Sequence, residues 1–258
     1  MTSPAMYGPQ RHRQILDALA RDGRVSVAAL AEQFDVTTET IRRDLEQLAS
    51  RDLLVRVHGG AVAASTTIAE PDLATRATTN VEAKTRIGIA ASALLPRDAS
   101  APVLVDAGST TAALVPHLAG RTGLVLTHGL EVASRALAVA GPPVHLLPGR
   151  LRPSTGAAVG ADTVDALSRL TPEVAFLGCN GVDLDGASTP DTEEAAVKAA
   201  IVRRARRRVL LADASKFGVQ HLVTFAPLDA FDALVTDSEP SADLREALTA
   251  ARIEVVVA

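Results

Sequence analysis

Seven short apolar runs, rich in valine and leucine, recur between residues 100 and 258, and alanine-rich stretches with helical spacing separate most of them. This alternation predicts an α/β fold with a largely parallel sheet that helices cover on both faces. Ligands of such sheets bind at the carboxyl ends of the strands. A further alanine-rich helix is predicted over residues 81–95, before Pro96. The seven runs are "APVLVDAG", "GLVLTHG", "PVHLLPG", "EVAFLGCNG", "RVLLADAS", "ALVTD" and "IEVVVA".

The first 60 residues follow a different pattern, which predicts three short amphipathic helices. The first helix spans residues 10–20 and ends near Gly23, since glycine is favoured just after a helix C-terminus. Ser26 is placed to cap the second helix and Thr37 the third, through side-chain oxygens that accept hydrogen bonds from open backbone N–H groups. The buried stripes of these two helices consist of Val27, Leu30, Ala31, Phe34, Ile41, Leu45 and Leu48.

Two helices around a tight turn, followed by "LLVRVHGGAV", have the dimensions of a helix-turn-helix with a two-stranded wing around Gly59 and Gly60. With Ile41 facing inward, helical phase places Arg42 and Arg43 on the sides or outer face of the third helix. These arginines are therefore free to meet a nucleic acid.

Charge alone does not decide between DNA binding and an ordinary solvated helix face. Residues 10–60 hold eight Arg and eight acidic residues, and a pair such as Arg42 and Glu46 would be enough to make a solvated face. The whole chain has a net charge of −4, so any DNA contact must be local. What favours DNA is that Arg42, Arg43, Arg56 and His58 gather on the third helix and the wing.

We predict a DNA-binding domain over residues 8–62, a linker over 63–79 and a larger domain over 80–258, because the intervening stretch is small and polar. No run is long and apolar enough for a membrane span, and no secretory signal opens the chain, so we expect a cytoplasmic protein without a membrane partner. A single cysteine, Cys179, excludes an internal disulfide framework and a multi-cysteine zinc site.

Polar residues follow the predicted strands of the larger domain. The turn Gly108–Ser109–Thr110–Thr111 offers backbone N–H groups and hydroxyls at a helix start, which suits a phosphate, although such turns also occur as plain helix caps. Cationic groups, carboxylates and amides at the other strand ends would suit a phosphorylated sugar, and a solvated salt bridge is the alternative for each cation taken singly. The other strand-end candidates are Thr127, His128, Arg150, Arg152, Asn180, Asp213, Ser215 and Lys216, and a nearby helix adds Glu193, Glu194 and Lys198. The arginine-rich residues 203–208 read as the charged C-terminal turn of a helix.

The words "ETIRRDL" and "RVHGGA" resemble the N-terminal winged helix-turn-helix of the DeoR family of bacterial transcription regulators. The resemblance implies that the third helix reads operator DNA. Its implied contacts are Thr38, Thr40, Arg42 and Arg43 in the major groove and Arg56 and His58 near the backbone or minor groove. Asp52 departs from the family, which usually has glycine there.

The words "DAGSTT", "TPDTEEAAVK" and "ADASKFG" extend the resemblance to the C-terminal sensor of the same family, which is similar to the ribose-5-phosphate isomerase fold. The motifs "MYGPQR", "LTHG" and "GCNG" resemble those of actinobacterial repressors of operons for the uptake of fructose and other sugars. The family usually has Gly-Gly at Pro148–Gly149 and commonly Asp at Asn180. The effector-pocket residues that the resemblance implies are Asp106, Ser109, Thr110, Thr111, Arg152, Lys198 and Lys216, and we add Gly108, His128 and Asn180 from the strand ends.

We therefore predict a DNA-binding repressor of sugar uptake or catabolism genes that is not an enzyme and needs no cofactor. Its expected partners are double-stranded operator DNA, a phosphorylated sugar such as fructose 1-phosphate, and further copies of itself in a dimer or tetramer. The alternative is a sugar-phosphate isomerase with an accessory DNA-binding domain. Asn180 counts against it, because a neutral amide cannot take the proton that isomerisation moves, although Asp106, Asp213 or Glu194 could. A third possibility is that the sensor pocket binds no ligand and the protein only binds DNA or partner molecules.

Overall fold

A computed structural model describes residues 8–22, 24–49, 53–57, 59–63, 73–139 and 141–258. Two compact units make up the chain, one over Met1–Thr67 and the other over Ile68–Ala258. Among the helices in the described ranges, none combines the length and the apolar character that crossing a membrane requires.

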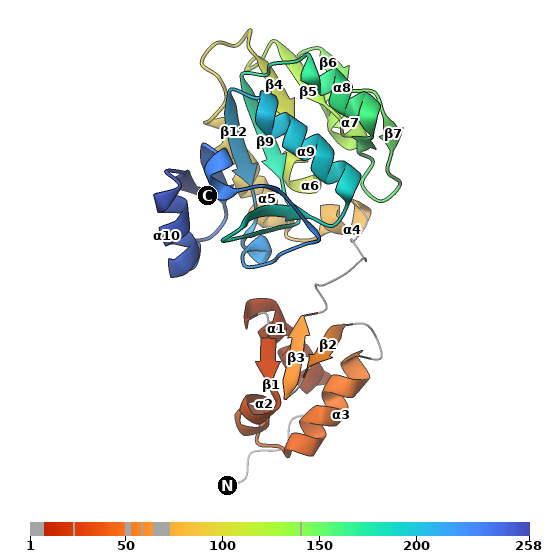
Figure 1. Ribbon diagram of the computed structural model, residues 1–258, viewed down its shortest axis with the longest axis vertical. Helices are drawn as coiled ribbons and strands as arrows, with labels where there is room; N and C mark the ends of the chain where they lie inside the picture. Colours follow the sequence, from red (N-terminus) through yellow and green to blue (C-terminus); the bar gives the residue numbers. More distant parts are fainter. Residues whose placement is uncertain (1–7, 23, 50–52, 58, 64–72, 140) are drawn as a thin grey trace. The chain divides into compact units, whose positions relative to one another are not determined.

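The smaller unit contains three helices and a three-stranded antiparallel sheet in the order β1-β3-β2 (Figure 1). Its apolar core is formed by one side of each helix together with Leu54 and Ala61 from the sheet, and every predicted stripe residue of the second and third helices is part of it. The predicted wing is present as the hairpin β2–β3, whereas β1 was not predicted. The elements are α1 (Gly8–Asp22), β1 (Arg24–Ser26), α2 (Val27–Phe34), α3 (Thr38–Ala49), β2 (Leu54–Val57) and β3 (Gly60–Ala63).

Capping and turn residues in the smaller unit explain where its helices start and stop. Ser26 Oγ accepts from the backbone N–H of Ala29 at 3.2 Å, which confirms the predicted cap of α2. At the other end, Asp35 adopts a left-handed conformation (φ 51°) and turns the chain toward α3. The predicted stop at Gly23 lies outside the described residues.

The two glycines of the wing, Gly59 and Gly60, are required for different structural reasons. Gly59 has a φ of +80°, which a residue with a side chain rarely adopts. Gly60 lies against β1, so a Cβ atom there would stand 2.0 Å from the carbonyl oxygen of Val25. The pair therefore lets the wing turn and lets β3 lie close to β1.

The larger unit is built on a seven-stranded sheet in the order β15-β14-β12-β9-β4-β5-β6, in which every pairing is parallel. All seven predicted strands are present, and the α/β class with a parallel sheet is confirmed. The strands are β4 (Pro102–Val105), β5 (Leu124–Thr127), β6 (Val144–Leu146), β9 (Val174–Gly178), β12 (Arg207–Leu211), β14 (Ala233–Thr236) and β15 (Glu254–Val257).

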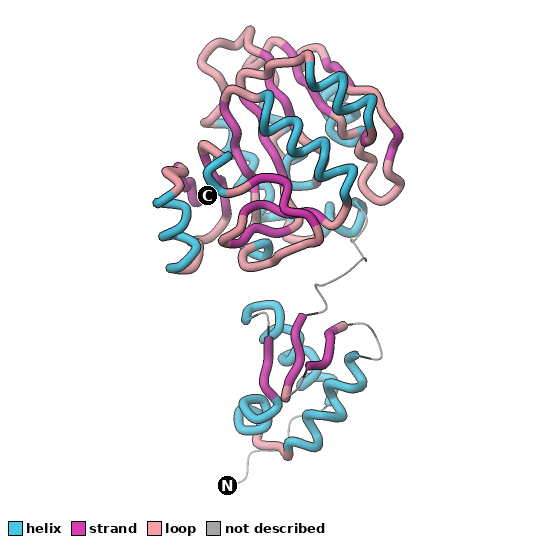
Figure 2. The backbone as a smooth tube through the Cα atoms, in the orientation of Figure 1, coloured by secondary structure: helices cyan, strands magenta, loops and turns pink. Residues whose placement is uncertain are grey.

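Helices cover both faces of this sheet, because successive strand residues point to opposite sides. Leu104, Leu177 and Leu210 face the core under α8, α9 and α10, whereas Val105, Phe176 and Val209 face the core under α5, α6 and α7. Figures 1 and 2 show α9 lying along the sheet beside β9. The helices are α4 (Leu73–Thr78), α5 (Val81–Ser92), α6 (Ser109–Ala112), α7 (Leu130–Ala138), α8 (Ala161–Ser168), α9 (Thr192–Arg204) and α10 (Ala242–Ala250), with 3-10 turns η1 (Val115–His117), η2 (Ala214–Lys216) and η3 (Leu228–Ala230).

Several elements of the larger unit differ from the sequence-based expectation. The helix predicted to start at the turn 108–111 is divided into α6 and η1, because Pro116 has no N–H to donate and its ring collides with a carbonyl one turn earlier. Part of the predicted linker forms α4. Arg203 and Arg204 lie in the last turn of α9 as predicted, but Arg207 and Arg208 belong to β12. The hairpin β7 (Arg150–Leu151) and β8 (Ala158–Val159) and the small sheet of β10 (Gly181–Asp183), β11 (Gly186–Thr189) and β13 (Val223–Ala226) were not predicted.

We predict that Gly60→Ala destabilises the smaller unit by roughly 1–3 kcal/mol, because its methyl group must push β3 away from the backbone of β1. Gly59→Ala meets no atom within 4 Å and should cost only about 1 kcal/mol, through its positive φ. Thermal unfolding of both variants measures the difference. Equal losses would contradict the close approach at Gly60.

Candidate functional site

Helix α3 starts at a pair of threonines. The backbone N–H of Thr40 donates to Thr37 Oγ1 at 3.2 Å, and the two hydroxyl oxygens lie 2.9 Å apart. This confirms the predicted cap. Thr38 is exposed and Thr40 is partly buried at the same end of the helix. The cap thus holds two small polar side chains at the N-terminal end of α3.

Asp44 ties α3 to α1. It is buried, and its Oδ2 accepts from Arg11 Nε at 2.5 Å and its Oδ1 from Arg11 Nη2 at 3.0 Å. His12 Nε2 also lies 3.0 Å from Asp44 Oδ1. The sequence analysis missed this role, although Asp44 lies three positions after Ile41, on the buried side of the helix. A charged residue at such a position needs a partner, because an unpaired charge is costly to bury. The motif "IRRDL" therefore contains two exposed arginines, Arg42 and Arg43, and one buried aspartate, Asp44, that binds α1.

Arg42 and Arg43 point outward from α3, with side chains 54% and 79% exposed. Both approach Glu39 rather than Glu46, at 3.4 Å and 3.7 Å, and such exposed pairs are worth little free energy. They can exchange this partner for a phosphate or a base edge at small cost.

The wing lies beside the same helix. Arg56 Nη1 on β2 is 3.9 Å from Glu46 Oε1 on α3, and the Arg56 side chain is 43% exposed. The structure thus places Arg56 beside α3, within ion-pair distance of Glu46. His58, the remaining predicted DNA contact, lies outside the described residues.

In the larger unit, the order of the strands reverses between β4 and β9, which is where open parallel sheets bind ligands. Asp106 follows β4 at this point and is fully buried. Its Oδ1 lies 2.7 Å from His128 Nε2, and its Oδ2 accepts from the backbone N–H of Gly178 at 2.9 Å. Lys198 Nζ on α9 also donates to Oδ2. The two oxygens of the Asp106 carboxylate are therefore bound by groups from three different parts of the fold.

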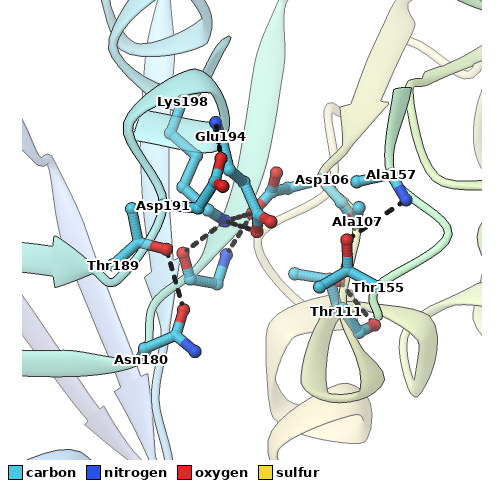
Figure 3. Close-up of polar contacts among 12 residues, drawn as sticks. Asp106, Ala107, Thr111, Thr155, Ala157, Asn180, Thr189, Asp191, Glu194 and Lys198 are labelled. Carbon is cyan, nitrogen blue, oxygen red and sulfur yellow. Dashed lines mark hydrogen bonds and ion pairs between the residues drawn. The ribbon is translucent and has the colours of Figure 1, made fainter. Parts of the chain in front are cut away.

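Opposite charges keep both members of the buried pair ionised. Burial alone would raise the pKa of Asp106, but the charge of Lys198 and the hydrogen bond and charge of His128 outweigh it and hold that pKa at about 2. For Lys198, burial acts to lower the pKa, and the charges of Asp106 and Glu194 reverse this and raise it. Figure 3 shows Lys198 and Glu194 of α9 gathered around Asp106.

The chain of charges continues outward from Lys198. Glu194 Oε1 lies 3.8 Å from Lys198 Nζ, and Glu194 Oε2 accepts from Arg152 Nη1. Arg152 Nε lies 3.3 Å from Asp191 Oδ2, and Asp191 also caps α9 by accepting from the Glu194 N–H at 2.8 Å. Arg152 is thus turned toward carboxylates of this chain.

The turn 108–111 presents groups of two kinds. Gly108 has a φ of +151°, and Thr111 is buried, with its hydroxyl donating to Asp106 O and Gly108 O at 2.7 Å and 2.9 Å. Ser109 and Thr110 are half-buried, and no hydrogen bond of their hydroxyls is found within the ranges that the structure describes. As first residues of α6, their N–H groups have no partner within the helix.

Two further strand ends complete this edge of the sheet. Asn180, after β9, accepts from Thr189 Oγ1 at 3.1 Å, as Figure 3 shows. Lys216 lies in η2 after β12 and is half-buried, and it makes no ion pair with any residue described here. Asp213, at the start of η2, has one oxygen, Oδ2, that is buried without a hydrogen-bond partner among the described residues. This edge therefore holds unpaired donors, an unpaired cation and an unpaired acceptor.

The ten predicted effector residues thus fall into groups. Asp106, Thr111, His128, Arg152, Asn180 and Lys198 hydrogen-bond to other parts of this chain, and Gly108 shapes the turn. The residues with uncommitted side chains, among those described, are Ser109, Thr110 and Lys216. These three side chains can therefore bind an anion without giving up a hydrogen bond or ion pair to another described residue.

Two family models match the chain. One, the DeoR-like helix-turn-helix domain, matches residues 11–67, and the other, the DeoR C terminal sensor domain, matches residues 79–238.

Curated relatives are similar to this chain over nearly its full length. The glycerol-3-phosphate regulon repressor of Escherichia coli is 32% identical over 97% of this chain and 99% of its own length. The HTH-type transcriptional regulator GlpR of Haloferax volcanii is 34% identical over 97% of this chain and 98% of its own. Among solved structures, ribose 5-phosphate isomerase A from Methanocaldococcus jannaschii aligns with 54% of this chain and 55% of that chain at 17% identity, with a TM-score of 0.40.

We predict that acid removes part of the stability of the larger unit through Asp106. Its pKa in the folded chain, about 2, is below the unfolded value of 3.8, so its contribution is present above pH 4 and is lost as the pH falls toward 2. The loss should be roughly 2 kcal/mol.

Asp106→Asn tests this. At pH 7 it should be destabilised by roughly 3–5 kcal/mol because the buried charge of Lys198 loses its nearest anionic partner, and the difference from wild type should narrow toward pH 2. Adding Lys198→Met should recover part of the stability. A difference in unfolding free energy that stays constant from pH 5 to pH 2 would argue against the assigned pKa.

Proposed function

The chain belongs to the DeoR family of transcriptional regulators, and we propose that it is a repressor whose hold on operator DNA is controlled by a phosphorylated sugar. The DNA-binding domain and the sensor domain are both matched in one chain, in the same order as in relatives aligned over nearly their full length. The observation that carries the effector half of the proposal is the set of uncommitted groups at Ser109, Thr110 and Lys216.

For DNA, we propose that α3 enters the major groove with Thr38, Thr40, Arg42 and Arg43, while the wing places Arg56 and His58 near the backbone or minor groove. Support comes from the exposure of both arginines and from the buried Asp44, which ties α3 to α1. Weak pairing with Glu39 means that little is lost when a phosphate replaces it.

For the effector, we propose that the turn 108–111 and Lys216 hold the phosphate. Open N–H groups and hydroxyls at a helix start form a concave donor set, and one lysine adds a cation. The unpartnered Asp213 Oδ2 is suited to accept a hydrogen bond from a sugar hydroxyl. Asp106, Lys198, His128 and the other paired residues then support the pocket from below.

The names of relatives guide the choice of sugar phosphate. One relative is called a glycerol-3-phosphate regulon repressor, and another, 32% identical over 91% of this chain and 93% of its own length, is called FruR of Bacillus subtilis. We propose fructose 1-phosphate or a similar small phosphorylated sugar. A sugar phosphate that weakens DNA binding must itself bind less tightly to the DNA-bound form.

We also propose that the chain works as a dimer or tetramer in the cytoplasm. A symmetric oligomer would match a symmetric operator, with each DNA-binding unit on one half-site.

The isomerase alternative is not favoured. The relatives carry the names of regulators and repressors, and the chain is a regulator rather than an enzyme. The buried carboxylate of Asp106 is held by Lys198, His128 and the Gly178 N–H, so it is poorly placed to abstract a proton from a ligand.

We predict that Arg43→Ala weakens binding to the DNA upstream of this protein's gene by roughly 1–3 kcal/mol and lessens the dependence of affinity on salt. Fluorescence anisotropy at several salt concentrations measures both. Arg13→Ala, an exposed arginine on α1, is the control and should bind as wild type does. Unchanged affinity in Arg43→Ala would exclude α3 as the reading element.

We predict that Thr110→Val combined with Lys216→Ala removes the response to sugar phosphates and leaves DNA binding intact. A thermal-shift screen with fructose 1-phosphate, glycerol 3-phosphate and inorganic phosphate should stabilise wild type but not the variant, because a ligand of the folded state raises the melting temperature. A variant that still responds would place the phosphate elsewhere, and one that also loses DNA binding would indicate general unfolding.

A further inference from the structure

Helix α4 (Leu73–Thr78) is the first described element after residues 64–72, which join the sensor domain to the wing of the DNA-binding domain in sequence. Any change in the position of α4 therefore changes where the tether of the DNA-binding domain begins. The contacts of α4 decide what could move it.

At its N-terminal end, α4 is fastened to the β7–β8 hairpin. The Leu73 N–H donates to Ser154 O at 2.8 Å, and a Cβ atom on Gly156 would lie 4.0 Å from Leu73 Cδ2. The same hairpin carries Arg152, which is bound to Glu194 and Asp191. The β7–β8 hairpin thus holds the start of α4.

At its C-terminal end, α4 is clamped by a buried lysine of α5. Lys84 is 6% exposed, and its Nζ donates to Arg76 O at 2.5 Å and to Thr79 O at 2.7 Å. Burial lowers the pKa of Lys84, and the charge of Asp213 partly offsets this. The last carbonyls of a helix lack internal partners and carry negative partial charge, so a cation there stabilises the helix end.

The junction between α4 and α5 is bound to the turn that carries Lys216. Asn80 adopts a left-handed conformation (φ 53°), and its Nδ2 donates to Asp213 Oδ1 at 3.0 Å and lies 3.4 Å from Ser215 Oγ. Helix α4 also packs against α6, which begins with Ser109 and Thr110. Both parts of the proposed pocket, the turn 108–111 and the turn that carries Lys216, therefore contact the segment 73–84.

Polar contacts, rather than apolar burial, hold α4 in place. Every residue of Leu73–Thr78 is described, and none of its side chains is buried. A six-residue helix is not stable by itself, so α4 depends on these few contacts. Elements with little buried apolar surface detach at small free-energy cost.

We propose that α4 is the element that carries effector occupancy from the sensor pocket to the DNA-binding domain, with Lys84 and Asn80 as the residues that hold it. The inference rests on the proposed function. A sugar phosphate drawn onto Ser109, Thr110 and Lys216 shifts the walls to which α4 is fastened and alters the start of the tether. Lys84 and Asn80 are positioning residues that need not touch the ligand.

Two variants of the full chain test this. Lys84→Met removes the clamp while keeping a long unbranched side chain. Asn80→Gly removes the bonds to Asp213 and Ser215 while keeping the left-handed backbone unstrained, so it serves if Lys84→Met folds poorly. Arg86→Met is the matched control, since Arg86 lies on the same helix, is 49% exposed and pairs with Asp237 at 3.8 Å.

Three measurements are compared: hydrogen exchange of residues 73–79, thermal shift with fructose 1-phosphate and glycerol 3-phosphate, and DNA affinity with and without each sugar phosphate. In both variants we expect faster hydrogen exchange of residues 73–79 and unchanged binding of the sugar phosphate. We also expect the effect of the sugar phosphate on DNA binding to be lost, so that the ratio of the DNA dissociation constants with and without sugar phosphate approaches 1. In wild type and Arg86→Met that ratio should be on the order of 5 to 150.

Each contrary outcome is distinct. A wild-type ratio of 1 with every probe overturns the proposed function and this inference with it. A normal wild-type response that both variants keep despite faster exchange overturns the inference alone. Unchanged exchange shows that Lys84 and Asn80 do not hold α4, and loss of sugar-phosphate binding assigns them to the pocket instead. Both results also overturn the inference.

Discussion

The architecture of the sensor domain depends on one buried ion pair, Asp106 with Lys198. A lone charge in this position would cost several kcal/mol, and the pair is tolerated because hydrogen bonds from Gly178 N and His128 satisfy the remaining acceptor sites. These partners come from β9, from the loop after β5 and from α9, while Asp106 itself directly follows β4. A single carboxylate thereby fixes the strand ends at the point where the sheet order reverses.

This pairing also explains which residues remain for a ligand. Lys198, Glu194 and Arg152 form a continuous line of alternating charge, so each is satisfied within the chain. Ser109, Thr110 and Lys216 have no such partner among the described residues, and we propose that an anion binds to these three side chains. In the proposed pocket, the paired side chains form a rigid frame, and the side chains without partners supply the free energy of ligand binding.

Much of this could be predicted from sequence, and the reasons for the failures are specific. Apolar runs gave all seven parallel strands, and side-chain chemistry gave the caps at Ser26 and Thr37, since both signals are local. The partners of Asp44 and Asp106 were missed, because they lie 33 and 92 positions away and no local pattern records them. Helix α4 was missed for the opposite reason: its own sequence has no apolar stripe, and contacts from Lys84 and Ser154 create it.

A helix made by contacts from its surroundings is well suited to regulation. Helices held by a large apolar face stay in place when a ligand adds a few kcal/mol elsewhere, whereas α4 is held by hydrogen bonds that are individually worth about 1 kcal/mol, or about 1.5–3 kcal/mol where the charged Lys84 donates. Allosteric coupling free energies are of similar size, typically about 1–3 kcal/mol. In the proposed mechanism, an effector would therefore not need to distort the seven-stranded sheet or break the Asp106–Lys198 pair. It needs only to alter the balance of a few polar contacts at the point where the tether to the DNA-binding domain begins.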